Sequence, residues 1–377
     1  MNAPKRFISL DAFRGLTIAL MILVNTPGSW SHVYAPLRHA PWSGCTPTDL
    51  VFPFFLFIVG VAMAFSFHKF DYQLTRPAVK KIIGRMVTIF VIGILLNAFP
   101  FIRQDWDYSH FRIMGVLQRI ALAYGIAALL CLWLPQKKQW YVGGGILIFY
   151  WLIMWIGGSS PEPFSLVNNF AAKFDLAILG DNHVYHGYRD AAGNSVAFDP
   201  EGLFSTLPAI VTAMLGYQIG SLIQSAKNQK DKLKRLLIVG GALVTVGWVW
   251  GLFFPINKPI WTSSYVLYTG GLATLFLTLC IWVIDIKGYK KLAWPFVIFG
   301  SNSIFVFAAS GLWVKTIVRV KYTLNEETVN AYTYLYKTVF VPLAGDLNGS
   351  FLFALSHILM WLLVLYWLDR KKIYIKI

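Results

Sequence analysis

Charged residues are scarce in this sequence. Asp, Glu, Lys and Arg make up 13% of its 377 residues, against roughly 25% in an average soluble domain. Hydrophobic residues make up 57%, and no long polar block separates the apolar runs. The composition excludes an ordinary soluble protein and predicts an integral membrane protein that forms one domain over residues 1–377.

Cysteine and acidic residues are also few. The three cysteines, Cys45, Cys131 and Cys280, are far apart and form no CxxC pair, so neither a disulfide framework nor a metal site is expected. The net charge of +16 comes from Lys and Arg in short runs between apolar segments. That distribution is typical of membrane topology and argues against a nucleic-acid partner.

Ten apolar segments are long enough to cross a bilayer, which takes about 20 residues per helix. They predict an all-α, polytopic transmembrane helix bundle. The segments lie at approximately 8–26, 50–67, 82–99, 113–134, 139–157, 203–223, 236–254, 263–284, 294–314 and 350–368.

Lys and Arg in the connections predict the orientation, because basic residues accumulate on the cytoplasmic side. With a cytoplasmic N-terminus, 21 of them fall inside and ten outside, and an even number of spans places both termini in the cytoplasm. The connection 158–202 is then an outer polar loop, rich in acidic residues.

Ionisable residues inside predicted spans are costly and therefore suggest function. Arg14 is three residues from Asp11 in the first span, a spacing that favours a local ion pair. Arg119 lies deeper, in the fourth span, and needs a carboxylate, phosphate or carbonyl partner. Asp49 and Asp107 are the acids that we expect to pair with it.

The connection LRHAPWSGCTPTDLVFP (37–53) carries a histidine and an aspartate at the predicted outer mouth of the bundle. Histidine exchanges protons near neutrality, whereas Asp49 at the start of the second span could simply favour the helix dipole. Asn25 ends the first span. Together, His39, Asp49 and Asn25 could form a base, its orienting carboxylate and a carbonyl-polarising amide.

Several blocks resemble the heparan-α-glucosaminide N-acetyltransferase family, including its bacterial NagX-type relatives. The resemblance covers essentially the whole membrane core. The blocks, in the order of the family, are SLDAFRGLTIALMILVN (9–25), RHAPWSGCTPTDLVFPFFLFIVGVAMAFS (38–66), GVLQRI (115–120), FDPEGLFSTLPAI (198–210), FPINKPIWTSSYVLYTGG (254–271) and FGSNSIFVF (299–307).

The resemblance implies a membrane acetyltransferase that takes an acetyl group from cytoplasmic acetyl-CoA, its cosubstrate, and gives it to a glucosamine amine across the membrane. The family's catalytic histidine falls on His39, within its His-Ala-x-Trp-x-Gly-x-Thr block, and its catalytic asparagine falls on Asn25. Asp49 would orient His39 or bind the sugar.

The anionic end of acetyl-CoA needs cationic partners, and Arg14, Arg85 and Arg119 are candidates by charge alone. Trp42, Lys258 and Trp261, at the predicted outer rim, are candidates for contact with the sugar. The alternative is a NagX-type transporter of amino sugars or cell-wall fragments. We further expect a bacterial inner-membrane location, contact with membrane lipids and a homodimer, the commonest symmetric oligomer.

Overall fold

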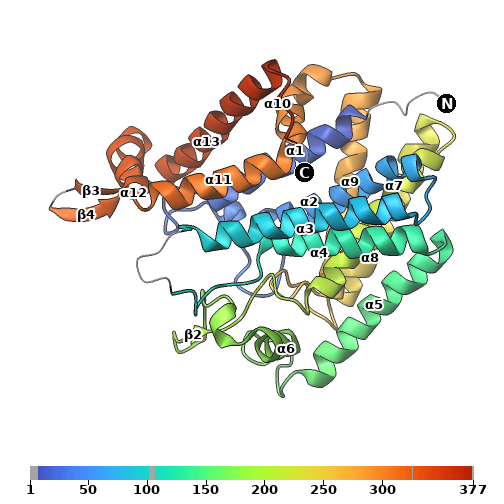
Figure 1. Ribbon diagram of the computed structural model, residues 1–377, viewed down its shortest axis with the longest axis horizontal. Helices are drawn as coiled ribbons and strands as arrows, with labels where there is room; N and C mark the ends of the chain where they lie inside the picture. The colour runs from blue at the N-terminus through green and yellow to red at the C-terminus, as the bar shows by residue number, and fades with distance from the viewer. Residues whose placement is uncertain (1–6, 102–106, 325, 376–377) are drawn as a thin grey trace. The chain divides into compact units, whose positions relative to one another are not determined.

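The computed structural model describes residues 7–101, 107–324 and 326–375, and these residues are mostly helical (Figure 1). Within them, strands occur only in two short antiparallel hairpins, β1–β2 and β3–β4. The all-α, polytopic class predicted from hydropathy is therefore confirmed. The strands are β1 (Tyr188–Arg189), β2 (Ser195–Val196), β3 (Lys321–Leu324) and β4 (Glu327–Asn330).

Contacts divide the chain into two compact units. The described part of unit 1 comprises residues 41–45 and 53–282, and unit 2 comprises residues 7–40, 46–52 and 283–375. Within the described residues the backbone passes between the units four times. The expectation of a single domain stays a prediction. The short connection that carries His39 and Asp49 is shared, because residues 41–45 belong to unit 1 and the residues on both sides belong to unit 2.

Unit 1 is built around a central helix, α7 (Thr206–Ser225), which is the most buried of the helices that could span a membrane. It packs against α2, α4, α5, α8 and α9. Further pairs form between α3 and α4 and between α8 and α9. The helices of unit 1 are α2 (Val51–Ser66, from Pro53 on), the 3-10 helix η3 (Phe67–Phe70), α3 (Arg76–Ala98), α4 (Val116–Trp133), α5 (Gln136–Gly157), α6 (Phe170–Leu179), η4 (Asp181–His183), α8 (Gln229–Trp250) and α9 (Ser263–Cys280).

Unit 2 packs α1 (Ile8–Asn25) against three other helices. Its closest partner is α10 (Lys290–Ser301): a Cβ atom on Gly15 would lie 1.6 Å from the carbonyl oxygen of Phe296, and one on Gly300 would lie 2.2 Å from that of Asp11. Small residues allow such close packing of membrane helices. The remaining helices are η1 (Ala35–Leu37), η2 (Pro47–Leu50), η5 (Ile281–Ile286, from Val283 on), α11 (Ser303–Ile317), α12 (Ala331–Leu335), η6 (Tyr336–Phe340) and α13 (Val341–Arg370).

Eight helices of the described chain are long and apolar enough to cross a membrane, or nine if α10 and α11, bent by 73° at a break, form one span. Each of the ten predicted segments coincides with one of these spans or with α3. The predicted segment 82–99 lies in α3, which has 23 residues but is not among the nine. The prediction of about ten spans is therefore close, and the sidedness of the termini stays a prediction.

The break between α10 and α11 falls at Asn302, which is buried. Its Oδ1 atom accepts a hydrogen bond of 2.7 Å from the backbone N–H of Ile375. The Asn302 side chain thus engages the backbone of the C-terminal segment at the point where helical bonding is interrupted.

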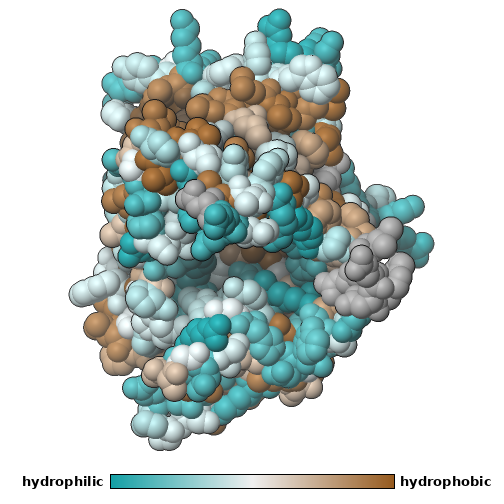
Figure 2. Space-filling model, turned by 90° about the vertical axis from the view of Figure 1, so that its left-hand side faces the viewer, coloured by the Kyte–Doolittle hydropathy of each residue, from teal (hydrophilic) through white to brown (hydrophobic). Residues whose placement is uncertain are grey.

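Apolar side chains also lie on the surface. In the most apolar stretch of each helix, only 22% of the residues of α5 and 17% of those of α8 are buried. Both helices expose Trp, Ile and Leu side chains. Figure 2 shows hydrophobic side chains (brown) exposed on the face that it presents. Spans with apolar outer faces fit a lipid environment, and the chain is a multi-pass membrane protein.

Candidate active site

His39 and Asp49 form a hydrogen-bonded pair in unit 2. The Nδ1 atom of His39 lies 2.6 Å from Oδ1 of Asp49. The Asp49 side chain is 2% exposed and that of His39 is 43% exposed. A buried carboxylate beside Nδ1 selects the tautomer with its proton on Nδ1. The ring nitrogen Nε2 is then left as the basic atom.

The Asp49 carboxylate is held by the local backbone. Its Oδ2 atom accepts hydrogen bonds from the backbone N–H groups of Ala40 and Thr46, each at 3.0 Å, and from Thr46 Oγ1 at 2.9 Å. Thr46 and Asp49 form a capping box at the start of η2, with Pro47 as its first residue. The same carboxylate therefore caps the helix and contacts His39. Its role as the orienting carboxylate of a base stays a prediction.

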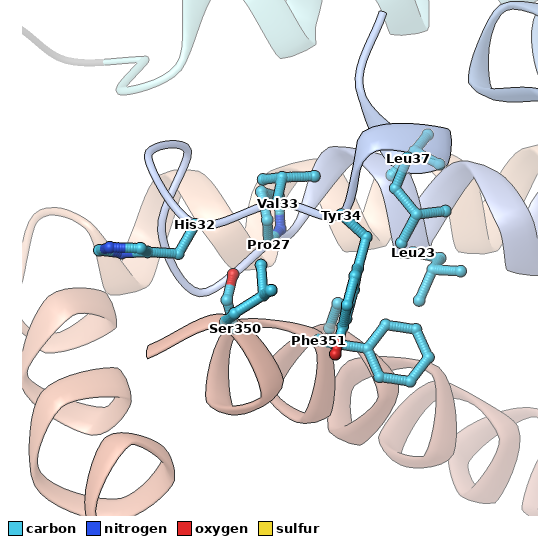
Figure 3. A pocket seen from close by; sticks show the side chains of 11 residues that line it. Leu23, Pro27, His32, Val33, Tyr34, Leu37, Ser350 and Phe351 are labelled. Atoms are coloured by element: carbon cyan, nitrogen blue, oxygen red, sulfur yellow. The ribbon is translucent and has the colours of Figure 1, made fainter. Parts of the chain in front are cut away.

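The segment before His39 is anchored on α13. Tyr34 donates its hydroxyl hydrogen bond to Asn348 Oδ1 and packs edge-on against Phe351, with ring centroids 5.9 Å apart. A mostly apolar pocket lies at this junction, between the end of α1, residues 32–37 and α13 (Figure 3). We infer that these contacts hold the backbone that leads to His39 in place.

Asn25 is the last residue of α1, and its side chain is exposed. It lies in the same unit as His39 and Asp49. Its predicted role as the amide that polarises a carbonyl stays a prediction.

Arg119 and Trp261 meet inside unit 1. The guanidinium carbon of Arg119 lies 5.2 Å from the centre of the Trp261 ring, and the two side chains are 0% and 1% exposed. Trp261 adopts a φ of +47°, which is uncommon for a bulky residue. The contact was not anticipated, because sequence reasoning assigned these residues separately to the donor and to the sugar.

The hydrogen-bond partners of Arg119 are a backbone carbonyl and a hydroxyl. Its Nη2 atom donates to the carbonyl oxygen of Gly202 at 3.1 Å and to Ser205 Oγ. The carbonyl partner was among the three kinds predicted, whereas Asp49 and Asp107 are not ion-pair partners of Arg119 in the described chain. The Nε and Nη1 atoms of Arg119 are buried without a hydrogen-bond partner in the described residues.

The loop at residues 158–202, which is predicted to lie on the outer side, is anchored by Arg112. Arg112 donates to both carboxylate oxygens of Asp199, at 2.8 and 2.6 Å, and to Glu201 at 2.7 Å. Burial alone would lower the pKa of Arg112, but the hydrogen bonds and negative charges of Asp199 and Glu201 outweigh it and raise the pKa. Arg112 therefore stays charged and ties the residues before α4 to those before α7.

Asp175 in α6 is 1% exposed and accepts a hydrogen bond of 2.9 Å from the backbone N–H of Phe204. Burial raises its pKa to about 7, against 3.8 for an ordinary aspartate. Its second oxygen, Oδ2, is buried without a partner in the described chain. A Cβ atom on Gly202 would lie 1.8 Å from that oxygen, so the carboxylate and the partner of Arg119 are packed together.

Trp42 and Lys258, the other two candidates for contact with the sugar, lie in unit 1. Trp42 donates its indole N–H to the carbonyl oxygen of Phe164 at 2.9 Å and packs edge-on against Phe198, with ring centroids 5.4 Å apart. Lys258 is half-buried in the loop that leads to Trp261 and accepts the backbone N–H of Trp261 through its own carbonyl oxygen. Their roles in sugar contact stay predictions.

The other two arginine candidates differ in their surroundings. Arg14 lies 3.7 Å from Asp11, as its spacing predicts. The guanidinium of Arg85 lies 4.8 Å from the centre of the Tyr124 ring, and its Nε atom is buried without a partner in the described residues. Arg85 therefore keeps a hydrogen-bond donor for another group.

Sequence reasoning missed Thr46 and Asp175 as site residues. Thr46 carries a sequence signal, because Thr-Pro-Thr-Asp places a capping residue three positions before an acidic one. Asp175 carries none, since its burial depends on the packing of the loop around α6.

Comparisons with known proteins show the family of the chain. The family model described as heparan-alpha-glucosaminide N-acetyltransferase, catalytic, matches residues 6–236. The human heparan-alpha-glucosaminide N-acetyltransferase is 29% identical over 430 residues, which cover 99% of this chain and 60% of the relative. The mouse protein of the same name is 28% identical over 435 residues, which cover 100% of this chain and 61% of the relative.

The chain thus spans about three fifths of the length of the curated relatives that it matches. The matched region contains His39, Asp49 and Arg119 and covers more than half of the chain. The chain belongs to the heparan-alpha-glucosaminide N-acetyltransferase family.

Proposed function

We propose that this chain transfers an acetyl group from acetyl-CoA to the amine of a glucosamine-type sugar at the outer face of the membrane. The relatives are named as glucosaminide N-acetyltransferases. The observation that carries the proposal is the contact of 2.6 Å between His39 Nδ1 and Asp49 Oδ1. It supplies an oriented base on a partly exposed side chain.

His39 acts first on the amine. A protonated amine has no lone pair for attack, so Nε2 of His39 removes one proton and leaves the nitrogen nucleophilic. The nitrogen then forms a bond to the thioester carbonyl carbon, and the bond from that carbon to sulfur breaks. His39 releases that first proton to water. It then takes the second proton that the nitrogen loses after attack and passes it to the leaving sulfur, which gives the amide and the free thiol. Asp49 stabilises the charged imidazole between these two transfers.

Asn25 is the proposed donor to the carbonyl oxygen. Its side-chain amide would hydrogen-bond to the negative charge that develops on that oxygen during attack. The exposed position of Asn25 at the end of α1 leaves its amide open to a ligand.

The acyl donor requires hydrogen-bond donors and positive charge. Arg85 and Arg119 each keep at least one buried N–H group without a partner in the described chain, which fits a ligand rich in acceptor oxygens. We assign both, together with Arg14, to the binding of acetyl-CoA. Arg14 is the weakest of the three, because it already contacts Asp11.

Trp42, Lys258 and Trp261 are the proposed contacts of the sugar. Trp42 and Lys258 retain exposed surface. Trp261 is 1% exposed, so we expect it to act mainly by holding Arg119 rather than by stacking on a sugar ring. A homodimer in the inner membrane of a bacterium, in contact with lipids, completes the proposal.

The test is an acetyl-CoA consumption assay with the purified full chain. We expect consumption only when glucosamine or a glucosamine-terminated oligosaccharide is present, and we expect His39→Ala to abolish it. His68→Ala is the matched control, because His68 is exposed and its Nδ1 contacts only the carbonyl oxygen of Phe65. Normal turnover by His39→Ala would refute the mechanism. Uptake of labelled sugar into proteoliposomes without acetyl-CoA would instead support the transport alternative.

A further inference from the structure

Three cationic side chains meet in unit 1, at the turn that joins α2 to α3. The positive charges of Lys81 and Arg85 both act on Lys69. Lys81 and Arg85 are one helical turn apart on α3, so they point to the same side. We call these three residues the cation cluster.

The turn that forms the cluster is unusual. Asp71 and Tyr72 both adopt left-handed backbone conformations, with φ of +51° and +55°. The Tyr72 hydroxyl donates to Gln224 Oε1 on α7 at 3.2 Å. This sharp reversal brings Lys69, at the end of η3, back beside the first turns of α3. Strain of this kind persists only where the surrounding structure enforces it.

The cluster has no internal counter-charge. No carboxylate of the described chain forms an ion pair with Lys69, Lys81 or Arg85. The segment 68–85 contains five Lys and Arg residues and one acidic residue, Asp71. Like charges held at close range repel one another, so an anion that neutralises these charges would stabilise the arrangement.

The Arg85 guanidinium has a fixed orientation and keeps a hydrogen-bond donor available. It rests 4.8 Å from the centre of the Tyr124 ring, a contact that fixes the plane of the guanidinium. Its buried Nε atom has no partner in the described residues. A phosphate group accepts several charge-assisted hydrogen bonds at once, which one carboxylate or carbonyl cannot match.

We propose that Lys69, Lys81 and Arg85 bind the phosphate groups of the nucleotide end of the acyl donor. The inference rests on the proposed function, because that function requires a donor that carries a phosphorylated nucleotide. It also ranks the arginines: Arg85 contacts the phosphates, whereas Arg14 is neutralised by Asp11. The basic connection 68–81 is on the predicted cytoplasmic side, where the donor is made.

The test measures binding without turnover, with the full chain in neutral phosphatidylcholine nanodiscs. Coenzyme A and pantetheine are titrated separately, since pantetheine lacks the nucleotide. We expect Lys69→Gln, Lys81→Gln and Arg85→Gln each to weaken coenzyme A binding by about tenfold and to leave pantetheine binding unchanged. Lys80→Gln is the matched control, because it removes the same charge next to Lys81 and should change neither affinity.

Equal coenzyme A affinity in the cluster variants and in Lys80→Gln would overturn the inference, even if the protein transfers acetyl groups. In a second set of nanodiscs that contain phosphatidylglycerol, retention of this lipid by the purified chain is measured as well. Loss of that retention in the cluster variants with unchanged coenzyme A affinity would also overturn the inference, since the phosphate would then come from a lipid. Cluster-dependent coenzyme A binding in a protein that transfers no acetyl group would support the inference and refute the proposed function.

Discussion

Arg112 and Asp199 are 87 residues apart in the sequence and are joined by two hydrogen bonds, Nε to Oδ2 at 2.8 Å and Nη2 to Oδ1 at 2.6 Å. Asp199 is 1% exposed. The planar guanidinium matches the two carboxylate oxygens. The pair fixes the loop that contains Gly202 and Ser205, which both accept hydrogen bonds from Arg119. It therefore supports the buried arginine indirectly.

Removing one charge from this pair should destabilise unit 1. Asp199→Asn leaves Arg112 with Glu201 alone, and breaking a buried pair costs about 3–5 kcal/mol. We expect a clear fall in the melting temperature in detergent. Asp181→Asn, in the same loop but with a side chain that is 68% exposed, is the control and should melt like the native chain. Equal melting temperatures for the two variants would contradict the structural role.

Asp175 should make stability depend on pH. Its pKa is about 7 in the folded chain, because of burial, and 3.8 is the ordinary value. Between these values the folded state holds a proton that the unfolded state has lost. This group therefore destabilises the fold progressively as pH rises from about 4 to about 7, by at most about 4 kcal/mol.

Asp175→Asn removes that titration and retains an oxygen for the Phe204 N–H. We expect the melting temperature of the variant, relative to the native chain, to increase from pH 4 to pH 7 and to level off above. Asp181→Asn should show a constant difference over the same range. A constant difference for Asp175→Asn as well would show that Asp175 titrates normally.

Asp49→Asn should impair catalysis more than folding. The amide no longer selects the Nδ1 proton of His39, so the basic nitrogen is wrongly placed. We expect kcat to fall by about 100-fold, with little change in the KM for acetyl-CoA. Steady-state kinetics measure both values, and Asp346→Asn, an exposed site in the same unit, is the control. A raised KM with native kcat would mean that Asp49 binds substrate instead.

The Thr46 hydroxyl should matter through Asp49. Thr46 Oγ1 lies 2.9 Å from Asp49 Oδ2 and 2.8 Å from the carbonyl oxygen of Arg38. We expect Thr46→Val to lower kcat by about tenfold and Thr46→Ser to restore it. Thr48→Val removes a hydroxyl from the same turn that contacts the Pro36 carbonyl oxygen at 3.3 Å, and it should leave kcat unchanged.

Nitrogen NMR of the His39 ring provides a second measurement for Thr46. The native chain and Thr46→Ser should show the Nδ1–H tautomer, and Thr46→Val a mixture. Identical spectra for the valine variants at positions 46 and 48 would exclude Thr46 as a positioning residue.

The contact between His39 and Asp49 could be predicted because both residues lie in one short connection. Likewise, hydropathy located the spans, since about 20 apolar residues are needed whatever the packing. It could not reveal the break at Asn302, because hydropathy reports the environment of a segment and not its direction. The bend falls at a residue whose side chain accepts a hydrogen bond from the backbone of a distant residue, Ile375.

Arg119 shows why partners are harder to predict than positions. Its burial could be inferred from its place in an apolar segment, but its partners are a carbonyl and a hydroxyl more than 80 residues away. Every residue has a carbonyl, so the sequence does not single out Gly202. The cation cluster was missed for a related reason, because it depends on two consecutive left-handed residues, Asp71 and Tyr72.

The close approach of α1 and α10 couples the position of Asn25 to the contact between these two helices. Gly15 and Gly300 lie at the crossing, and α1 continues from there for ten residues, about 15 Å, to Asn25. A methyl group at either glycine would force the two helices apart, change the tilt of α1 and displace its C-terminal end. If Asn25 has its proposed role, activity would be lost through a change ten residues away from it, while the His39–Asp49 pair stays intact.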